Sequence, residues 1–217
     1  NEKILNRLDN MVGLNKCKDT LREIIKYHEI MREYNCNIEF ENYNIIIRNE
    51  SAYNSYEKLV KVIAEIYYEN KIISNSDILY ISKDEIRLNR VKMEKLEGVE
   101  EGLIVFDLSD LSWNSSDIRK SIIQIINTFP TKSFIMIECS SKEGETNAQY
   151  FDYFTWAMKI NKISPDEKEI YVEKFMKKNN LIYSKDILKK ITENSYYKIQ
   201  SELINILVKS KINKTND

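Results

Sequence analysis

The chain has 217 residues and a mass of 25.8 kDa, with 33 Lys and Arg against 34 Asp and Glu and a formal net charge of −1. This length allows one large domain or two small ones with a sizeable core. The balanced charge argues against a dedicated nucleic-acid binder, and no apolar run approaches the roughly 20 residues of a membrane-spanning helix. The chain begins at Asn1 and not at Met, which suggests a piece cut from a longer protein.

The rare residue types exclude several kinds of site. Three cysteines, Cys17, Cys36 and Cys139, have no Cys-x-x-Cys spacing, so we expect no structural zinc site. Sparse cysteines in odd number suit a reducing cytoplasm. The single histidine, His28, lies in a helical stretch, where we expect a surface residue and not the centre of a catalytic triad. Only four glycines occur, and residues 14–97 contain none, which leaves little for a glycine-rich phosphate loop.

Hydrophobic periodicity predicts strands and helices in alternation over the first part of the chain. The expected helices cover residues 16–34, 56–69 and 115–127, and the expected strands cover 42–48, 77–82, 102–108, 133–138 and 154–160. Residues 83–97 mix charges of both signs, which is typical of a solvated helix face. The alternation predicts an α/β fold with a five-stranded parallel sheet and helices on both faces.

The tail of the chain has a different pattern. From Ser164 onward no strand pattern occurs, and Ser-Pro-Asp-Glu at 164–167 is typical of a helix start, with proline in the first position and acids following. Two more helices are expected at 183–192 and 196–211. We therefore predict an α/β domain over residues 1–163 and a small all-α lid domain over residues 164–217.

Three short stretches, taken in order, resemble a known family. Residues 8–18 read LDNMVGLNKCK, residues 62–67 read VIAEIY and residues 160–167 read INKISPDE. They resemble the opening stretch, the helix after the phosphate loop and the lid entry of the AAA+ ATPases, in the CbxX/CfqX branch that includes relatives of spore stage V protein K and rubisco activase. The resemblance spans nearly the whole chain and implies a P-loop NTPase-like fold. Sporulation and rubisco activation are associations of that family and are not read from these residues.

A P-loop has the pattern G-x-x-x-x-G-K-[ST], in which backbone N–H groups surround the phosphates, the lysine neutralises them and the hydroxyl holds magnesium. The resemblance places this motif on ESAYNSYE, where Glu50 and Ser55 occupy the glycine positions. Tyr56 occupies the lysine position and Glu57 the hydroxyl position. Two acids thus stand where a triphosphate would lie, and their charge opposes its binding. Lys58 could substitute only through a slip of register, and no glycine flanks it.

The Walker B strand of the family should end in two acids, the first for magnesium and the second for the attacking water. Here LIVFDL, residues 103–108, keeps Asp107 and has Leu108 in place of the second acid. Leucine cannot accept a proton or orient water, so the hydrolytic base is missing. Asp110 is a weak candidate replacement. Asp107 fits either a residual magnesium ligand or an acid that serves a turn at the strand end, and we favour the second interpretation.

Three further positions of the family are also altered. Tyr153 stands in the position of the arginine finger, which stabilises charge on a neighbouring subunit's γ-phosphate. The polar sensor falls near residues 139–141, Cys-Ser-Ser, where a serine could serve but is also ordinary turn chemistry. Lys198 stands near the lid sensor position, where it keeps the charge but lacks the bidentate geometry of arginine. A solvated helix lysine is the plainer interpretation of Lys198.

The loss of the P-loop, the catalytic acid and the arginine finger favours a degenerate AAA+ domain, a pseudo-ATPase with no catalytic residue, metal or cofactor. We expect it to act as an interaction or scaffold module in the cytoplasm. Its expected partners are proteins, such as active AAA+ subunits or other domains of the same chain, and neither nucleic acid nor a membrane. The alternative is a regulatory domain that binds ATP and magnesium with weak or no hydrolysis. An active ATPase with an aberrant loop is disfavoured by Glu50, Tyr56 and Leu108.

The altered loop also leads to a structural expectation. Tyr53 and Tyr56 are large, and we expect side chains to fill part of the hollow that would hold phosphate. Without glycine at either position, the positive-φ turns of a P-loop are costly. We therefore expect either a changed path of the loop or an earlier start of the following helix at about Ser55, with its hydroxyl as the cap.

Overall fold

The structure is a computed structural model, and its described residues are 1–10, 14–34, 43–50, 55–88, 90–99, 102–108, 116–138, 152–161 and 163–214. The chain forms two compact units, Asn1–Asn161 and Lys162–Asp217, called unit 1 and unit 2 below. Within the described residues, unit 1 contains all of the strands and unit 2 is helical.

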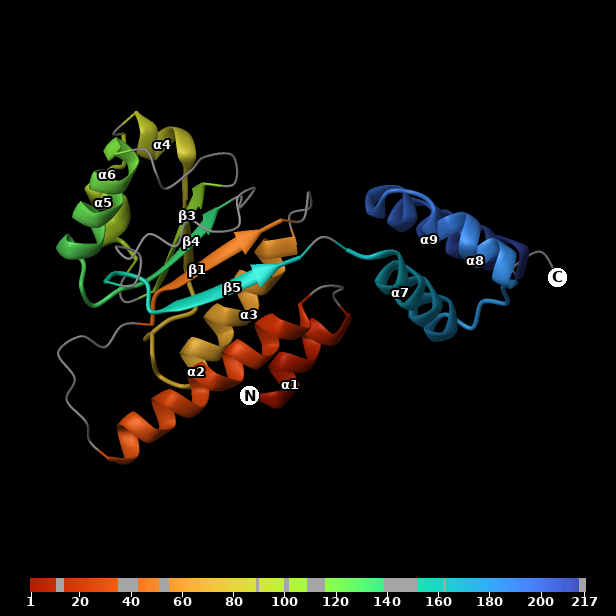
Figure 1. Ribbon diagram of the computed structural model, residues 1–217, viewed down its shortest axis with the longest axis horizontal. Helices are drawn as coiled ribbons and strands as arrows, with labels where there is room; N and C mark the ends of the chain where they lie inside the picture. The colour runs from red at the N-terminus through yellow and green to blue at the C-terminus, as the bar shows by residue number, and fades with distance from the viewer. Residues whose placement is uncertain are drawn as a thin grey trace. The chain divides into compact units, whose positions relative to one another are not determined.

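Unit 1 is built around one parallel sheet (Figure 1). Its described strands are β1 (Ile45–Asn49), β2 (Ile78–Ser82), β3 (Leu103–Leu108), β4 (Ser133–Glu138) and β5 (Trp156–Ile160). They lie in the order β2-β3-β4-β1-β5, and each neighbouring pair is parallel. Parallel neighbours need crossover connections, and here helices supply them. The predicted five-stranded parallel sheet is therefore confirmed.

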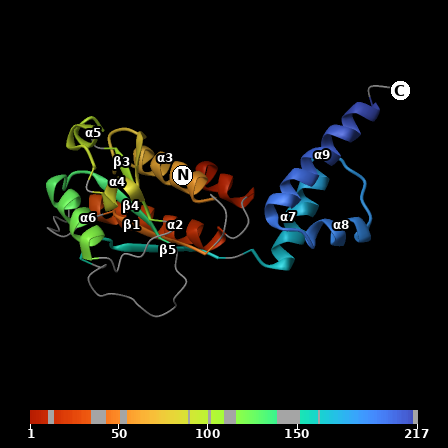
Figure 2. The ribbon, with the colours of Figure 1, turned by 90° about the horizontal axis from the view of Figure 1, so that it is seen from above.

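Helices cover both faces of the sheet (Figures 1 and 2). One face carries α1 (Glu2–Leu5), a 3-10 turn (Asn6–Asn10), α2 (Asn15–Glu33) and α3 (Ser55–Glu69). The other face carries α4 (Lys83–Arg87), α5 (Met93–Glu97) and α6 (Ser116–Thr128). The sequence analysis did not anticipate α1 and the 3-10 turn, because segments of four and five residues are too short to show helical periodicity.

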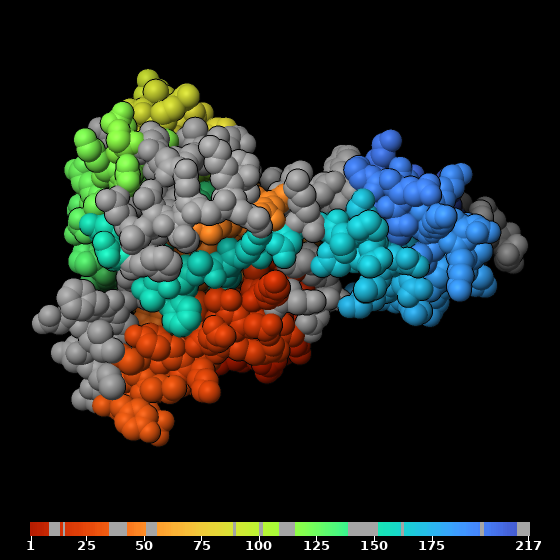
Figure 3. Space-filling view, in the orientation of Figure 1, coloured from red at the N-terminus to blue at the C-terminus, as the bar shows by residue number. Residues whose placement is uncertain are grey.

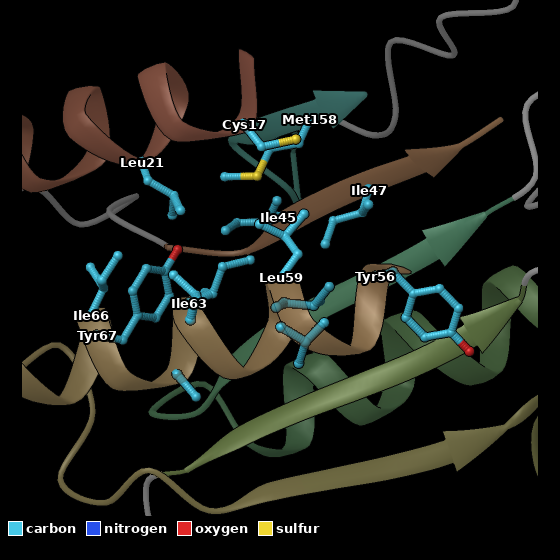
Figure 4. Close-up of a cluster of buried hydrophobic side chains, with 14 of the residues drawn as sticks. Cys17, Leu21, Ile45, Ile47, Tyr56, Leu59, Ile63, Ile66, Tyr67 and Met158 are labelled. Carbon is cyan, nitrogen blue, oxygen red and sulfur yellow. The ribbon is translucent and has the colours of Figure 1, made fainter. Parts of the chain in front are cut away.

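Side chains alternate along each strand, and the three central strands β3, β4 and β1 contribute side chains to two apolar cores. Ile45 and Ile47 of β1 pack on the side of α2 and α3, in the cluster drawn in Figure 4, whereas Ile46 packs on the side of α6. Burial on both faces explains why these strands read as nearly continuous apolar runs. The carboxyl ends of all five strands meet at one edge of the sheet.

Strand β5 forms an edge of the sheet next to α2. Its atoms reach the visible surface in teal, above the orange-red atoms of α2 (Figure 3). The buried Cys17 thiol of α2 donates a 3.6 Å hydrogen bond to the backbone carbonyl of Lys159 in β5. Burial raises the pKa of Cys17 to about 11, so this thiol stays protonated and acts as a small buried packing group.

Unit 2 contains α7 (Pro165–Lys178), α8 (Lys185–Thr192) and α9 (Tyr196–Lys214). The predicted helix start is confirmed, because a capping box precedes α7. The Ser164 side chain accepts from the Glu167 N–H, and the Glu167 side chain accepts from the Ser164 N–H. The core of unit 2 consists of Val172, Met176, Leu188, Ile191, Ile199 and Leu203.

Candidate functional site

The residues at the expected P-loop lysine and Walker B aspartate positions form a hydrogen bond with each other. Tyr56, in the first turn of α3, is only 6% exposed, and its hydroxyl donates a 2.9 Å hydrogen bond to Oδ2 of Asp107 at the end of β3. In an active relative, the residues at these two positions would contact phosphate and magnesium. Here they bind each other. A ligand that used Asp107 in the same way would have to break this bond.

The fold brings these two side chains together through ordinary packing. Asp107 shares a strand face with Leu103 and Val105, which pack in the same core as α3. Tyr56 precedes Leu59 and Val60 by three and four residues, so it lies on the buried face of α3. Figure 4 shows its hydroxyl pointing away from the labelled aliphatic side chains. The phenol thus spans from the apolar core to the polar end of β3.

The electrostatic environment of this site is negative. Burial, followed by the hydrogen bond and charge of Asp107, raises the pKa of Tyr56 well above its ordinary value, which keeps the phenol neutral and donating. Tyr80 on β2 also has a raised pKa, first through burial and then through the charges of Glu57 and Asp107. Glu57 itself is exposed. Such a field opposes the approach of an anion.

Glu50, in the first glycine position, is engaged by β5. Its backbone N–H donates a 2.9 Å hydrogen bond to the Ile160 carbonyl, and its carboxylate forms a 2.9 Å ion pair with Nζ of Lys159. The chain at Glu50 therefore remains joined to the sheet through backbone and side chain together.

A second ion pair lies on the neighbouring strand. Nε of Arg48 on β1 is 3.3 Å from Oε1 of Glu138, the buried last residue of β4. Arg48 is in register with Glu138 on one side and Lys159 on the other. Two cations thus lie on adjacent strands, and Glu50 and Glu138 compensate them. The sequence analysis missed both ion pairs. They depend on which strands are neighbours and on the register between them, and the sequence analysis determined neither.

The other P-loop and Walker B positions are also placed. Leu108 is fully buried and packs in the core on the α6 side, on the opposite face of β3 from Asp107. Helix α3 begins at Ser55 as predicted, but the expected hydroxyl cap falls on a side chain outside the described set. Residues 51–54, with Tyr53, and residues 109–115, with Asp110, also lie outside the described residues.

Two of the remaining family positions, Tyr153 and Lys198, lie within the described residues. Tyr153 is partly buried against the α6-side core, and its carbonyl accepts a 2.8 Å hydrogen bond from Nδ2 of Asn44. Lys198 is exposed in the first turn of α9, in unit 2. The polar sensor position, residues 139–141, lies outside the described residues.

The prediction of a surface position for His28 was wrong. His28 is half-buried, and its Nδ1 lies 2.7 Å from the Tyr43 hydroxyl in a hydrogen bond. The two rings also meet edge to face at 5.4 Å. Tyr43 lies just before β1 and contacts Tyr67 of α3 as well, so His28 belongs to a packed aromatic group at the opposite end of β1 from Tyr56. Among the described residues, no group of three His, Cys, Asp or Glu is placed to hold a metal ion.

Comparisons with known proteins identify the fold. No protein-family model and no curated protein matches the sequence. Solved structures do match: a replication initiator DnaA bound to AMPPCP and single-stranded DNA has a TM-score of 0.59 at 15% identity, covering 92% of this chain and 63% of that one. C. elegans PCH-2 has a TM-score of 0.52 at 11% identity, covering 92% and 69%, and Thermotoga maritima RuvB has 0.53 at 12%, covering 85% and 57%.

At these identities the likeness shows the fold alone. The five-stranded parallel sheet with helices around it is that of the AAA+ P-loop NTPase-like proteins, as the sequence predicted. The chain spans less than two thirds of the length of the DnaA and RuvB chains that it matches. The described residues contain no helix that is long and apolar enough to cross a membrane.

Proposed function

We propose that this chain is a catalytically inactive AAA+-like module, a pseudo-ATPase that serves as an interaction or scaffold domain. The observation that carries the proposal is the hydrogen bond between the Tyr56 hydroxyl and Asp107. It satisfies the Walker B carboxylate from inside the protein, with a neutral donor in the place of a cationic lysine. The phosphate chemistry has been replaced by a packing contact.

Three further features support the same proposal. Glu50 is bound to β5 by its backbone and its carboxylate, so an acidic side chain is held where the first glycine of a phosphate loop would lie. Glu57 adds an acid in the first turn of α3, where a phosphate would otherwise interact with the helix dipole. Leu108 is fully buried in an apolar core. Its side chain does not reach water and has no polar group that could activate a water molecule.

A fold of this kind that does not hydrolyse ATP can still act by binding other molecules through its surface. The proposed partners are proteins, either active AAA+ subunits in a mixed assembly or other domains of the same chain, in the cytoplasm. The three motif stretches in residues 8–18, 62–67 and 160–167 support the CbxX/CfqX branch as the origin of the module.

A second candidate is a regulatory domain that binds nucleotide and hydrolyses it slowly or not at all. Two observations favour it. Asp107 remains at the end of β3, and a DnaA structure of similar fold is bound to AMPPCP. This candidate requires Tyr56 to release Asp107 when ATP and magnesium enter, because the hydrogen bond and the metal would compete for the same carboxylate.

Two measurements on the purified chain test the proposal. Magnesium-dependent ATP hydrolysis should not exceed background, and it should be the same in Asp107→Ala and in Asp84→Ala, an exposed aspartate that serves as the matched control. Excess ATP with magnesium should not raise the melting temperature, whereas a ligand at 100 times its Kd would stabilise by about 2.7 kcal/mol.

The results separate the hypotheses. Turnover that is lost in Asp107→Ala and kept in Asp84→Ala would refute the inactive module, because a contaminating ATPase would not respond to the first change. A rise in melting temperature without turnover would favour the regulatory domain.

A further inference from the structure

The connection between α7 and α8 gathers exposed basic and apolar side chains. Residues 177–190, named the α7–α8 corner here, contain five lysines and one acid, Asp186. All five lysines are exposed: Lys177, Lys178, Lys185, Lys189 and Lys190. Two exposed isoleucines lie among them, Ile182 at 102% and Ile187 at 48%. The corner therefore combines a local net charge of +4 with apolar surface in contact with water.

The backbone holds Ile182 away from the core of unit 2. Two residues after the end of α7, Asn180 has φ 53°, and the Leu181 N–H donates a 3.0 Å hydrogen bond back to the Met176 carbonyl. Leu181 and Tyr183, the neighbours of Ile182, both pack against the unit 2 core. Because both neighbours are anchored, Ile182 projects at the tip of the connection. Burying the fully exposed Ile182 side chain against a partner surface would be favourable, because apolar surface would be removed from water.

The charges of the corner are largely uncompensated within unit 2. Among the described residues, Lys177 is the one corner lysine in an ion pair, with Glu173 at 3.6 Å. Unit 2 as a whole has 12 lysines and no arginine against eight Asp and Glu. Lysine provides flexible point charges, whereas arginine provides the planar fork that recognises single carboxylates or phosphates. The corner is therefore suited to a diffuse anionic surface.

We propose that the α7–α8 corner binds the surface of an anionic membrane, with its lysines among the lipid headgroups and Ile182 in the outer acyl region. Clustered lysines beside apolar side chains have the composition of a peripheral lipid-binding surface. Single-stranded nucleic acid fits less well, because Ile182 cannot stack on bases and Tyr183, the aromatic residue of the corner, packs inward. An acidic protein fits less well too, since lysine is depleted from protein interfaces. The inference departs from the expectation, drawn from the sequence, that no membrane is a partner, and it is independent of the proposed loss of ATPase activity.

Sedimentation of the full chain with lipid vesicles tests this inference. The probes are phosphatidylcholine vesicles and the same vesicles with about 30% phosphatidylserine, at about 0.1 M salt. Binding should occur with the anionic vesicles only, and it should be lost at about 0.5 M salt, where charges are screened over a shorter distance.

Matched variants assign the binding to the corner. Lys189→Glu/Lys190→Glu should weaken vesicle binding at least about tenfold, since each lysine near an anionic surface contributes to the attraction and each glutamate is repelled. The control Lys174→Glu/Lys209→Glu makes the same change of charge at exposed lysines of unit 2 outside the corner, and it should have a much smaller effect. Ile182→Ser should weaken binding about threefold or more without changing its salt dependence, whereas the exposed Ile204→Ser should not.

Several results would overturn the inference. Equal binding to neutral and anionic vesicles, or no binding to either, would remove the proposed surface. Equal losses in the corner variant and its charge control would reduce it to a net-charge effect. Binding of a thymidine 30-mer with no binding of vesicles would assign the corner to nucleic acid instead. Circular dichroism of each variant keeps loss of binding distinct from loss of folding.

Discussion

Helices α3 and α7 both begin at motifs of the AAA+ resemblance, but different kinds of contact support their first turns. At α7 the contacts are local, because Ser164 and Glu167 exchange hydrogen bonds three residues apart. At the start of α3 the described contact is long-range, from Tyr56 to Asp107 across 51 residues. In a phosphate-binding protein the ligand itself would satisfy the start of α3. The comparison teaches that a signal within four consecutive residues supports the start of α7, whereas a side chain 51 residues away in the sequence supports the start of α3.

This difference predicts unequal responses to mutation. Changes at the carboxyl end of the sheet should affect a buried site that joins α3 to β3. Changes at the start of α7 should affect one turn of one helix. If the proposed loss of phosphate chemistry is right, substitutions that bring back the motif residues should disturb the packing of this site.

The largest expected effect is that of Leu108→Glu, which restores the missing Walker B acid. Leu108 is fully buried in the α6-side core, so the new carboxylate would be a buried charge without a partner. We expect a loss of about 3–5 kcal/mol in the free energy of unfolding at neutral pH, measured by urea denaturation. Leu88→Glu is the control at an exposed leucine, with an expected change within about 0.5 kcal/mol. A cost below about 1 kcal/mol for Leu108→Glu would mean that the second acid could return to this position at no structural penalty.

The next effect is that of Tyr56→Phe, which removes the hydroxyl from Asp107. A hydrogen bond to a charged group contributes about 1.5–3 kcal/mol, so we expect destabilisation in that range. Tyr34→Phe is the control, because Tyr34 is 69% exposed. The double variant Tyr56→Phe/Asp107→Asn should cost less than the sum of the two single variants. Additive costs would indicate that the two side chains do not interact in solution.

The same hydroxyl should influence stability at alkaline pH. The pKa of Tyr56 is raised in the folded protein above its ordinary value of 10.0, so the unfolded chain loses this proton first. The stabilising contribution is complete below pH 10 and decreases as the pH rises further. Tyr56→Phe should therefore lose less stability than the wild type between about pH 10 and 11. Some loss should remain, because the buried Tyr67 also has a raised pKa. Identical alkaline profiles would contradict the coupling.

The parts of the structure that the sequence predicted are those with local or periodic signals. The apolar run of β3 and the Ser164 helix start needed only neighbouring residues to be recognised. The order of motifs assigned Tyr56 and Asp107 to the family's lysine and aspartate positions, and this assignment stays a prediction. Their hydrogen bond was not foreseen, although the adjacency of the two motifs in the fold could have indicated it. The ion pairs of Arg48 and Lys159 were not accessible, because they depend on strand register, which no local pattern determines.

A smaller effect is expected for Ser164→Ala at the other helix start. The loss of the side-chain acceptor leaves the Glu167 N–H without its cap and should cost about 1 kcal/mol. Amide hydrogen exchange at Glu167 should become faster, while exchange in the α8 residues should change little. Ser201→Ala is the control, at an exposed position inside α9, where alanine should be neutral or slightly stabilising. Faster exchange throughout unit 2 would show that this cap holds more than one turn.

The smallest expected effect is that of Tyr56→Lys on nucleotide affinity, and it tests whether a single charge was lost or a whole binding cradle. The new ammonium group would lie near Asp107 and restore the lysine of the motif. Two features would still oppose a triphosphate: the Glu57 charge remains, and neither loop position has glycine. The backbone N–H groups that surround phosphate depend on those glycines. We therefore expect calorimetric titration with ATP and magnesium to show no binding tighter than about 1 mM, as for the control Tyr80→Lys. Micromolar affinity in Tyr56→Lys alone would mean that the backbone groups that surround phosphate are intact. The hydrogen bond between Tyr56 and Asp107 would then be what blocks nucleotide binding, and one substitution would be enough to restore it.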